Sequence, residues 1–282
     1  MKITVLTLFK EMYEGFLNTS IIKRILESGI AEVKLVDIRD FSKEKHHNVD
    51  DTPYGGMAGM LMRVDIVKDA IDASKSSNSK VLLTSPKAKP LTQSDLERLK
   101  DLEDIVIVCG HYEGIDARIE KYVDEKVSIG DYVLTGGELP SMVLIDGILR
   151  LLEDSISKES LKEESYTDGL LEYDQYTRPF EYNGDEVPFV LTNGNHKDIK
   201  RFNLKSSLKN TLLYRKDLLD KKDLSEEEKN ILKEIEKRVL RKITVADCVA
   251  ADAMFEKLMG EEVEPRREFI EENAVYVKNL DI

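Results

Sequence analysis

Short apolar runs alternate with stretches of helical periodicity through the first half of the chain, and this alternation restricts the fold more than any other feature. The runs are of strand length, rich in β-branched residues and almost continuously apolar. They are Ile3–Phe9, Val33–Ile38, Val81–Ser85 and Ile105–Cys109, with a fifth, shorter one around Lys126–Ser128. Such strands, separated by helices, predict an α/β fold with a parallel sheet covered by helices on both faces.

Helices are expected between and after these strands, at Ser20–Glu27, Val64–Ala73, Thr92–Leu99 and Glu138–Leu152. The composition then changes, because residues 153–168 are polar and have no sustained period, which is typical of a flexible linker. We therefore assign residues 1–152 to a first domain and residues 169–244 to a smaller one.

One helix of the smaller domain is clearly marked, at Glu226–Arg241. Ser225 and Glu228 match a capping box at its start, and basic residues crowd its end. Residues 245–282 form an extension whose role the sequence does not reveal, with one further helix expected at Val245–Leu258.

Charge and composition exclude several classes of protein. The 282 residues carry a net charge of −13, which argues against a generic nucleic-acid coat protein, since such proteins are basic. No apolar run reaches the ~18–20 residues that span a bilayer, and the N-terminus has no signal-peptide cleavage site. Cys109 and Cys248 are too few for a disulfide framework or a cysteine metal site. These features favour a cytoplasmic protein that does not enter membranes.

Glycines gather where predicted strands end. Eight of the fifteen lie between Gly55 and Gly137. Cys109–Gly114 follows one strand, Ser128–Gly137 follows another and opens a helix, and Ser85-Pro86 ends a third. Since ligands of open α/β sheets bind at the carboxyl ends of strands, we expect these loops to build one pocket. Neither glycine-rich loop matches the dinucleotide or phosphate-loop fingerprint, so a nucleoside-like ligand held by backbone groups is favoured over a triphosphate.

A third glycine-rich stretch, Asp50–Met60, begins with paired carboxylates. These could bind a metal ion or orient a partner, and they could equally be turn residues and a helix cap. His46 and His47 lie nearby, but adjacent histidines point apart. We therefore assign no metal ligands.

Several long motifs occur together in a fixed order. They are Asp50-Asp51-x-Pro53-Tyr54-Gly55-Gly56, Tyr112-Glu113-Gly114-Ile115-Asp116-x-Arg118, Ser128–Leu139, Tyr176-Thr177-Arg178-Pro179, Val187-Pro188 and Gly194-Asn195-His196. Over roughly residues 1–242 the chain resembles the bacterial tRNA (guanine-N1)-methyltransferases of the SPOUT superfamily. The resemblance implies a parallel α/β domain with a C-terminal trefoil knot, followed by a flexible linker and a smaller helical domain. It also implies S-adenosylmethionine as methyl donor, guanosine 37 beside the tRNA anticodon as acceptor, and a homodimer with active sites at the subunit interface. A magnesium (Mg2+) requirement belongs to the family, although the sequence does not locate its ligands.

The resemblance also implies site residues. The donor site comprises Leu83, Ser85, Pro86, Gly110, Tyr112, Glu113, Gly114, Ile129, Gly130, Asp131, Tyr132, Val133, Leu134, Gly136 and Gly137. Glu164 stands where the family has its catalytic aspartate, with Glu163 as a competitor for the role, and Arg150 matches the arginine near guanine O6. The residues expected to contact RNA are Asp50, Arg178, His196, Lys197, Lys200, Arg201 and Lys205.

The chain departs from the family pattern at Met57, at Lys87-Ala88, at His111, where an arginine is common, and after Arg150. Two rival hypotheses remain open. The glutamate at position 164 and the altered linker favour an RNA-binding protein that kept the donor pocket and lost the chemistry. The other rival is a SPOUT enzyme that acts on a different RNA. The basic stretch Lys197–Lys216, which contains a single acidic residue, suits RNA phosphates in each case.

Overall fold

Five parallel strands form one sheet in the order β2-β1-β6-β5-β7, as the alternating pattern predicts. The strands are β1 (Lys2–Thr7), β2 (Glu32–Asp37), β5 (Lys80–Thr84), β6 (Asp104–Val108) and β7 (Glu125–Val127). Every residue of β6 is buried because this strand is flanked on both sides, whereas the edge strand β2 is partly exposed.

The computed structural model describes residues 1–153, 155 and 164–243. The chain divides into two compact units, Met1–Leu161 and Lys162–Ile282. The expected helix at Val245–Leu258, the extension 245–282, Cys248 and Glu163 lie outside the described residues. In the part that is described, no helix has both the length and the apolar content needed to cross a membrane.

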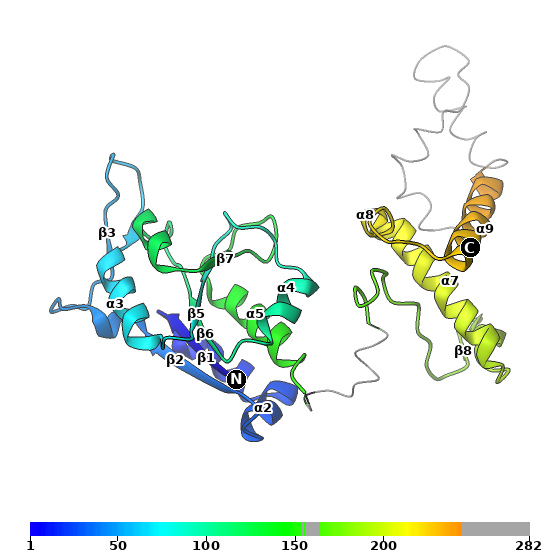
Figure 1. The fold of residues 1–282 in the computed structure, drawn as a ribbon, viewed down its shortest axis with the longest axis horizontal. Coiled ribbons are helices and arrows are strands. Elements are labelled where there is room, and N and C mark those ends of the chain that lie inside the picture. The colour runs from blue at the N-terminus through cyan, green and yellow to red at the C-terminus, as the bar shows by residue number, and fades with distance from the viewer. Residues whose placement is uncertain (154, 156–163, 244–282) are drawn as a thin grey trace, which may run out of the picture. The chain divides into compact units, whose positions relative to one another are not determined.

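Helices cover both faces of the sheet, as Figure 1 shows. One face carries Ile3, Val5, Ile105 and Ile107 and packs against α2 (Ser20–Glu27), α4 (Gln93–Leu99) and α5 (Glu138–Leu149). The other face carries Leu6, Val106 and Val108 and packs against α3 (Val64–Ser74). The two faces follow from the alternation of side chains along each strand.

The remaining elements of the first unit are short. They are the 3-10 helices η1 (Lys10–Tyr13), η2 (Ile38–Phe41) and η3 (Ala117–Tyr122), the helix α1 (Glu14–Leu17), and the antiparallel pair β3 (Asp50–Asp51) and β4 (Leu61–Met62). The helix expected at Glu138–Leu152 ends at Leu149, with Arg150 as its C-cap, so the apolar pattern overestimates its length.

The second unit is built from α7 (His196–Tyr214), α8 (Lys216–Leu219) and α9 (Glu226–Ile243), together with η4 (Phe189–Leu191) and the strand pair β8 (Glu181–Tyr182) and β9 (Asp185–Glu186). Its buried core is formed by Leu170, Leu208, Leu219, Ile231 and Ile235. The predicted capping box of α9 is confirmed, since Glu228 N donates to Ser225 Oγ at 3.2 Å and Ser225 N donates to Glu228 Oε2 at 2.7 Å.

Candidate active site

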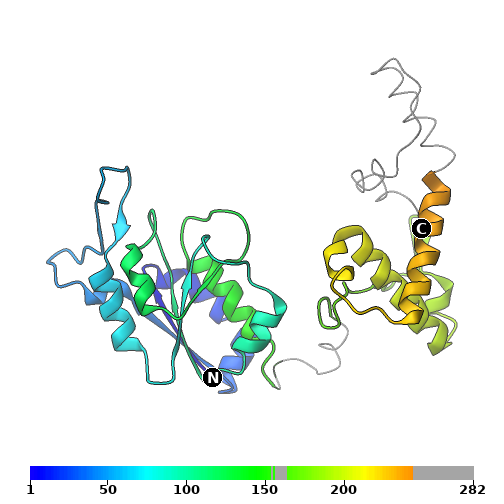
Figure 2. The ribbon, with the colours of Figure 1, turned by 45° about the horizontal axis from the view of Figure 1, so that its top comes forward.

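Loops that leave three neighbouring strands are joined by backbone hydrogen bonds at the carboxyl edge of the sheet. Ser85 N, after β5, donates to Val127 O, at the end of β7, at 2.9 Å. Gly137 N, in the loop after β7, donates to Gly110 O, in the loop after β6, at 2.8 Å. In Figure 2 these loops lie at the end of the sheet away from the N-terminus. The structure thus brings together the loops that the sequence singled out.

Gly137 is the point of closest approach between these loops. A Cβ atom here would lie 2.2 Å from Thr84 Oγ1, 2.8 Å from Cys109 Cα and 2.9 Å from Gly110 N. Since two of these atoms belong to backbone, no side chain can be accommodated without moving a strand end. Glycine is therefore required by close packing at this position.

The loop after β7 presents apolar side chains to solvent. Tyr132, Val133 and Leu134 are exposed, Val133 by 82%. The loop turns at Gly130, whose φ of 151° few other residues adopt. A Cβ atom on Gly130 would lie 2.5 Å from the Tyr132 ring. An exposed apolar rim at the end of a parallel sheet suits the apolar part of a ligand.

The loop after β6 turns at two residues with positive φ, Tyr112 (58°) and Gly114 (117°). It is held by the third glycine-rich stretch, since Glu113 N donates to Met60 O at 3.0 Å. A Cβ atom on Gly59 would lie 2.3 Å from Glu113 Cγ. Partial burial and the nearby Asp50 carboxylate raise the pKa of Tyr112, so Asp50 borders this loop.

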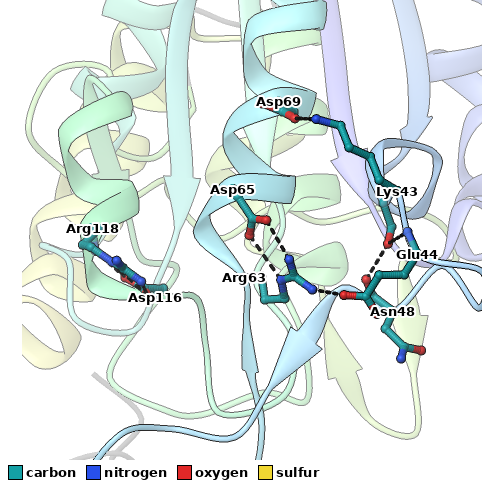
Figure 3. A network of polar contacts seen from close by, with 9 residues as sticks. Lys43, Glu44, Asn48, Arg63, Asp65, Asp69, Asp116 and Arg118 are labelled. Atoms are coloured by element: carbon teal, nitrogen blue, oxygen red, sulfur yellow. Dashed lines mark hydrogen bonds and ion pairs between the residues drawn. The ribbon is translucent and has the colours of Figure 1, made fainter.

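Ion pairs fix the base of the stretch that carries Asp50, as Figure 3 shows. Arg63, next to β4, pairs with Glu44 and with Asp65, and its backbone N donates to Val49 O at 2.8 Å. The hydrogen bond from Arg63 is the main reason that the pKa of Asp65 is lowered. These contacts join the two ends of the loop, Val49 and Arg63, to each other.

A buried polar network lies beneath the loops. Tyr13 OH is 2.5 Å from Ser141 Oγ and 3.5 Å from Cys109 Sγ. Burial raises the pKa of the Cys109 thiol to about 12, so this cysteine is protonated at neutral pH and is not a nucleophile. The network also includes Thr7, whose Oγ1 donates to Glu138 Oε1 at 2.8 Å. This network was not predicted from the sequence, although a glutamate and a serine on an otherwise apolar helix were a visible signal.

The two residues assigned to catalysis lie in different units. Arg150, the half-buried C-cap of α5, donates its backbone N to Asp146 O at 3.1 Å. Glu164 belongs to the second unit, where its carbonyl accepts from Thr167 N at 3.3 Å. Tyr166 lies in the same turn, and the guanidinium of Arg215, at the end of α7, is 5.6 Å from the centroid of its ring. The end of the predicted linker is therefore folded against the second unit.

Side chains of α7 hold the segment that follows this turn. Leu171 N donates to Thr211 Oγ1 and Asp174 N donates to Ser206 Oγ, both at 2.9 Å. The Asn210 side chain also donates to Asp174 Oδ1 at 2.9 Å. Asp174 thus ties the chain that leads from Glu164 to the helix with the basic residues.

Replacing Asp174 by asparagine should destabilise the second unit by about 1 kcal/mol near neutral pH, after allowance for solvent screening. Burial alone would raise the pKa of Asp174, but hydrogen bonds from Asn210 and Ser206 outweigh it and hold the pKa below its ordinary value of 3.8. A depressed pKa stabilises the fold above the unfolded value, and this stability is lost as pH falls through the folded value. Urea unfolding of the full chain should therefore show a difference between Asp174→Asn and the wild type at pH ~7 that shrinks as the pH is lowered below 3.8 and through the depressed folded value. Asp185→Asn is the control, and a difference that does not shrink as the pH falls would contradict the linkage.

The residues expected to contact RNA are only partly available. Lys197 and Lys200 are exposed at the start of α7 and have no carboxylate partner among the described residues. Arg201 pairs with Glu234 at 2.9 Å, and Lys209 pairs with Asp174 at 3.4 Å. His196 and Arg178 are exposed, and Lys205 is partly buried. Some basic residues of Lys197–Lys216 therefore form ion pairs within the second unit and are not free to bind RNA.

No group of three or more histidine, cysteine or acidic side chains is placed to hold a metal ion in the ranges that the structure describes. The described arrangement is that of an α/β protein whose glycine-rich loops meet at the carboxyl edge of a parallel sheet, the edge at which open α/β sheets bind ligands.

Comparisons with known proteins identify the family to which this α/β protein belongs. The family model "tRNA (Guanine-1)-methyltransferase TrmD" matches residues 1–221, and the chain belongs to this family. A model for the carboxyl terminus of the DNA gyrase B subunit matches residues 224–271.

Curated relatives agree with the family assignment. A tRNA (guanine-N(1)-)-methyltransferase of Syntrophomonas wolfei is 51% identical over 236 residues, which cover 83% of this chain and 97% of the relative. The corresponding protein of Caldanaerobacter subterraneus is 50% identical over 232 residues, 82% of this chain and 96% of its own length. That of Malacoplasma penetrans is 46% identical over 221 residues, 78% of this chain and 98% of its own length.

Proposed function

We propose that the chain is an S-adenosylmethionine-dependent methyltransferase that modifies N1 of guanosine 37 in tRNA. The observation that carries the proposal is the junction at Gly137, where the loops after β5, β6 and β7 meet so closely that only glycine fits. This junction forms the donor site in a chain whose first 221 residues match the methyltransferase family.

The residues of these loops fit the donor. The backbone of the loops at the carboxyl edge suits the polar edge of an adenine, and the exposed side chains of Tyr132, Val133 and Leu134 suit its apolar faces. The bound donor supplies an electrophilic methyl group on a sulfonium sulfur. The protein's contribution is to hold that methyl group in line with the acceptor nitrogen.

Guanine N1 carries a proton that must leave as the N1–CH3 bond forms and the S–CH3 bond breaks. The Glu164 carboxylate accepts this proton, and S-adenosylhomocysteine leaves with the electron pair of the broken bond. Glu164 lies on a turn held by hydrogen bonds within its unit, which supports a fixed position for a base. Negative charge gathers on guanine O6, and the fixed cation of Arg150 stabilises it.

The tRNA binds through the second unit, where Lys197 and Lys200 provide positive charge that no described carboxylate neutralises. Replacing both lysines by alanine should reduce the slope of log K against log salt by roughly two, about one for each phosphate that a lysine neutralises. Filter binding of unmodified tRNA over a range of salt concentrations measures the slope. Lys233→Ala, which removes an exposed lysine from α9, is the control. An unchanged slope in the double variant would remove α7 from the RNA interface.

Further features of the family complete the proposal. A homodimer with active sites at the subunit interface is supported by Leu139 and Val143, both 49% exposed one turn apart on α5. The close packing of Gly137 against Cys109 and Gly110 is compatible with a knotted chain at the start of α5. A reducing, cytoplasmic setting suits the protonated thiol of Cys109. The described residues do not fit the magnesium ion that the family resemblance implies, because they contain no group of three or more acidic, histidine or cysteine side chains placed to hold it.

The activity is tested with purified protein, donor labelled in its methyl group, and unmodified tRNA transcripts. We expect 1-methylguanosine at position 37, and no product from a transcript with adenosine there. Donor binding without product from any tRNA would favour the rival RNA-binding protein. Product from ribosomal RNA alone would favour a SPOUT enzyme with another substrate.

A further inference from the structure

Glu138 is a buried carboxylate that the proposed chemistry does not use. Only 2% of the residue is exposed, at the start of α5. One oxygen accepts from Thr7 Oγ1 at 2.8 Å, and the other, Oε2, lies 3.9 Å from His111 Nδ1. A buried carboxylate is costly unless its charge is paired and its oxygens are hydrogen-bonded. The nearest group that can supply a positive charge to Oε2 is His111.

The imidazole of His111 in turn lacks a hydrogen-bond partner for one of its nitrogen atoms within the described ranges. Its Nδ1 atom is buried and has no hydrogen-bond partner among the residues that the structure describes. The ring is held between Phe9 and Tyr112, with centroid separations of 4.9 and 5.1 Å. A buried polar atom without a partner destabilises the arrangement that leaves it so. A movement of about 1 Å would close the gap between His111 and Glu138 to hydrogen-bond distance and satisfy both groups.

The space between His111 Nδ1 and Glu138 Oε2 adjoins the two glycine-rich loops, Cys109–Gly114 and Ser128–Gly137, that are proposed to hold the donor. His111 faces Gly136 across an isolated antiparallel bridge. A Cβ atom on Gly136 would lie 2.4 Å from Glu138 Oε2 and 2.6 Å from His111 Nδ1, so the backbone of the second loop runs directly past the pair. A change in the separation of His111 and Glu138 therefore changes the spacing of the loops that hold the donor.

The other ionisable groups around the pair do not change charge near neutral pH. Burial raises the pKa of Tyr13 and raises that of Cys109 to about 12, so both stay neutral. Arg39 stacks on the Phe9 ring at 5.4 Å and pairs with Asp37 at 3.7 Å. The pKa of Tyr112, next to Asp50, is raised as well. Among the side chains around Glu138, only the imidazole of His111 is of a type that ordinarily gains or loses a proton between about pH 5 and 8.

We propose that Glu138 is a positioning residue for the donor site and acts through His111. When His111 is protonated, it pairs with Glu138, and the loops after β6 and β7 take the spacing that the donor requires. When His111 is neutral, the pair opens and the donor is held less tightly. The inference rests on the proposed function for the identity of the ligand.

The test is the affinity for S-adenosylhomocysteine, measured by calorimetry on the full chain at about pH 6 and about pH 8. We expect the wild type to bind about five- to tenfold more tightly at the lower pH, within the usual range of coupling between sites. Glu138→Gln should bind weakly at both pH values. His111→Arg, with a permanent charge, should lose the pH dependence and keep the tighter affinity.

The outcomes separate the two proposals. A wild type that binds equally at both pH values, or a Glu138→Gln variant that keeps the pH dependence, would overturn the positioning role and leave the donor site intact. A wild type that does not bind the ligand at all would overturn both. Circular dichroism checks that each variant folds. If Glu138→Gln does not fold, the His111→Arg variant decides the question. Donor affinity that still depends on pH in His111→Arg would exclude His111 as the group responsible.

Discussion

Replacing Glu164 by glutamine is expected to lower kcat by about 10²–10⁴-fold, the usual contribution of a positioned general base. Glutamine is of nearly the same size but cannot accept the N1 proton. The turn that carries Glu164 is held by backbone hydrogen bonds within the second unit, so the substitution should not disturb it. Single-turnover methylation of unmodified tRNA measures the chemical step, and the donor affinity, determined separately, should stay unchanged.

Glu163→Gln is the matched control, since it removes the neighbouring carboxylate that competes for the role. A loss of turnover in Glu163→Gln with normal turnover in Glu164→Gln would transfer the role of base to Glu163. Glu164→Asp should retain part of the activity, because it keeps the carboxylate and moves it by about 1 Å, a displacement that can cost ~10²-fold. Full activity in all three variants would mean that no carboxylate of this segment accepts the proton.

Replacing Gly137 by alanine should have the second large effect, on both donor binding and stability. The added Cβ atom would lie 2.2 Å from Thr84 Oγ1, 2.8 Å from Cys109 Cα and 2.9 Å from Gly110 N. Relief of these contacts requires the loops after β5 and β6 to separate. We expect a loss of about 3 kcal/mol in the free energy of unfolding and a ~10²-fold weaker affinity for S-adenosylhomocysteine.

Gly15→Ala is the matched control for this substitution. Gly15 lies in α1, and a Cβ atom there would meet nothing within 4 Å. Alanine also favours the helix by up to ~1 kcal/mol, so this variant should be as stable as the wild type or more so. Calorimetry and urea unfolding of the two variants give the comparison, and wild-type donor affinity in Gly137→Ala would show that the junction does not shape the pocket.

Periodicity predicted the first unit well because its elements have strong local signals. The five apolar runs appear as five parallel strands, each close to its expected bounds. The helix α7 was not predicted, since the residues that it buries include Ser206, Ser207 and Thr211 rather than a regular apolar stripe. The side chains of Ser206 and Thr211 hydrogen-bond to the segment after Glu164, which is a tertiary relation that no local pattern contains.

For a similar reason, the sequence predicted the loops of the candidate site but not the contacts between distant side chains. Glycine clusters indicated the loops, and strand-end geometry brought them together. The pairing of Arg201 with Glu234 could not be predicted, because the partners lie 33 positions apart. The same holds for Glu138 and His111, whose relation depends on how α5 meets the end of β6. The roles of Glu164 and Arg150 come from the family resemblance and stay predictions.

The buried thiol of Cys109 has a consequence for a protein that holds an alkylating agent. A thiolate is the form of cysteine that a sulfonium methyl donor can alkylate. The backbone of Cys109 packs against Gly137, while its sulfur lies 3.5 Å from Tyr13 OH. Burial raises the pKa of this thiol to about 12, so it stays protonated at neutral pH and does not compete with the RNA acceptor for the methyl group.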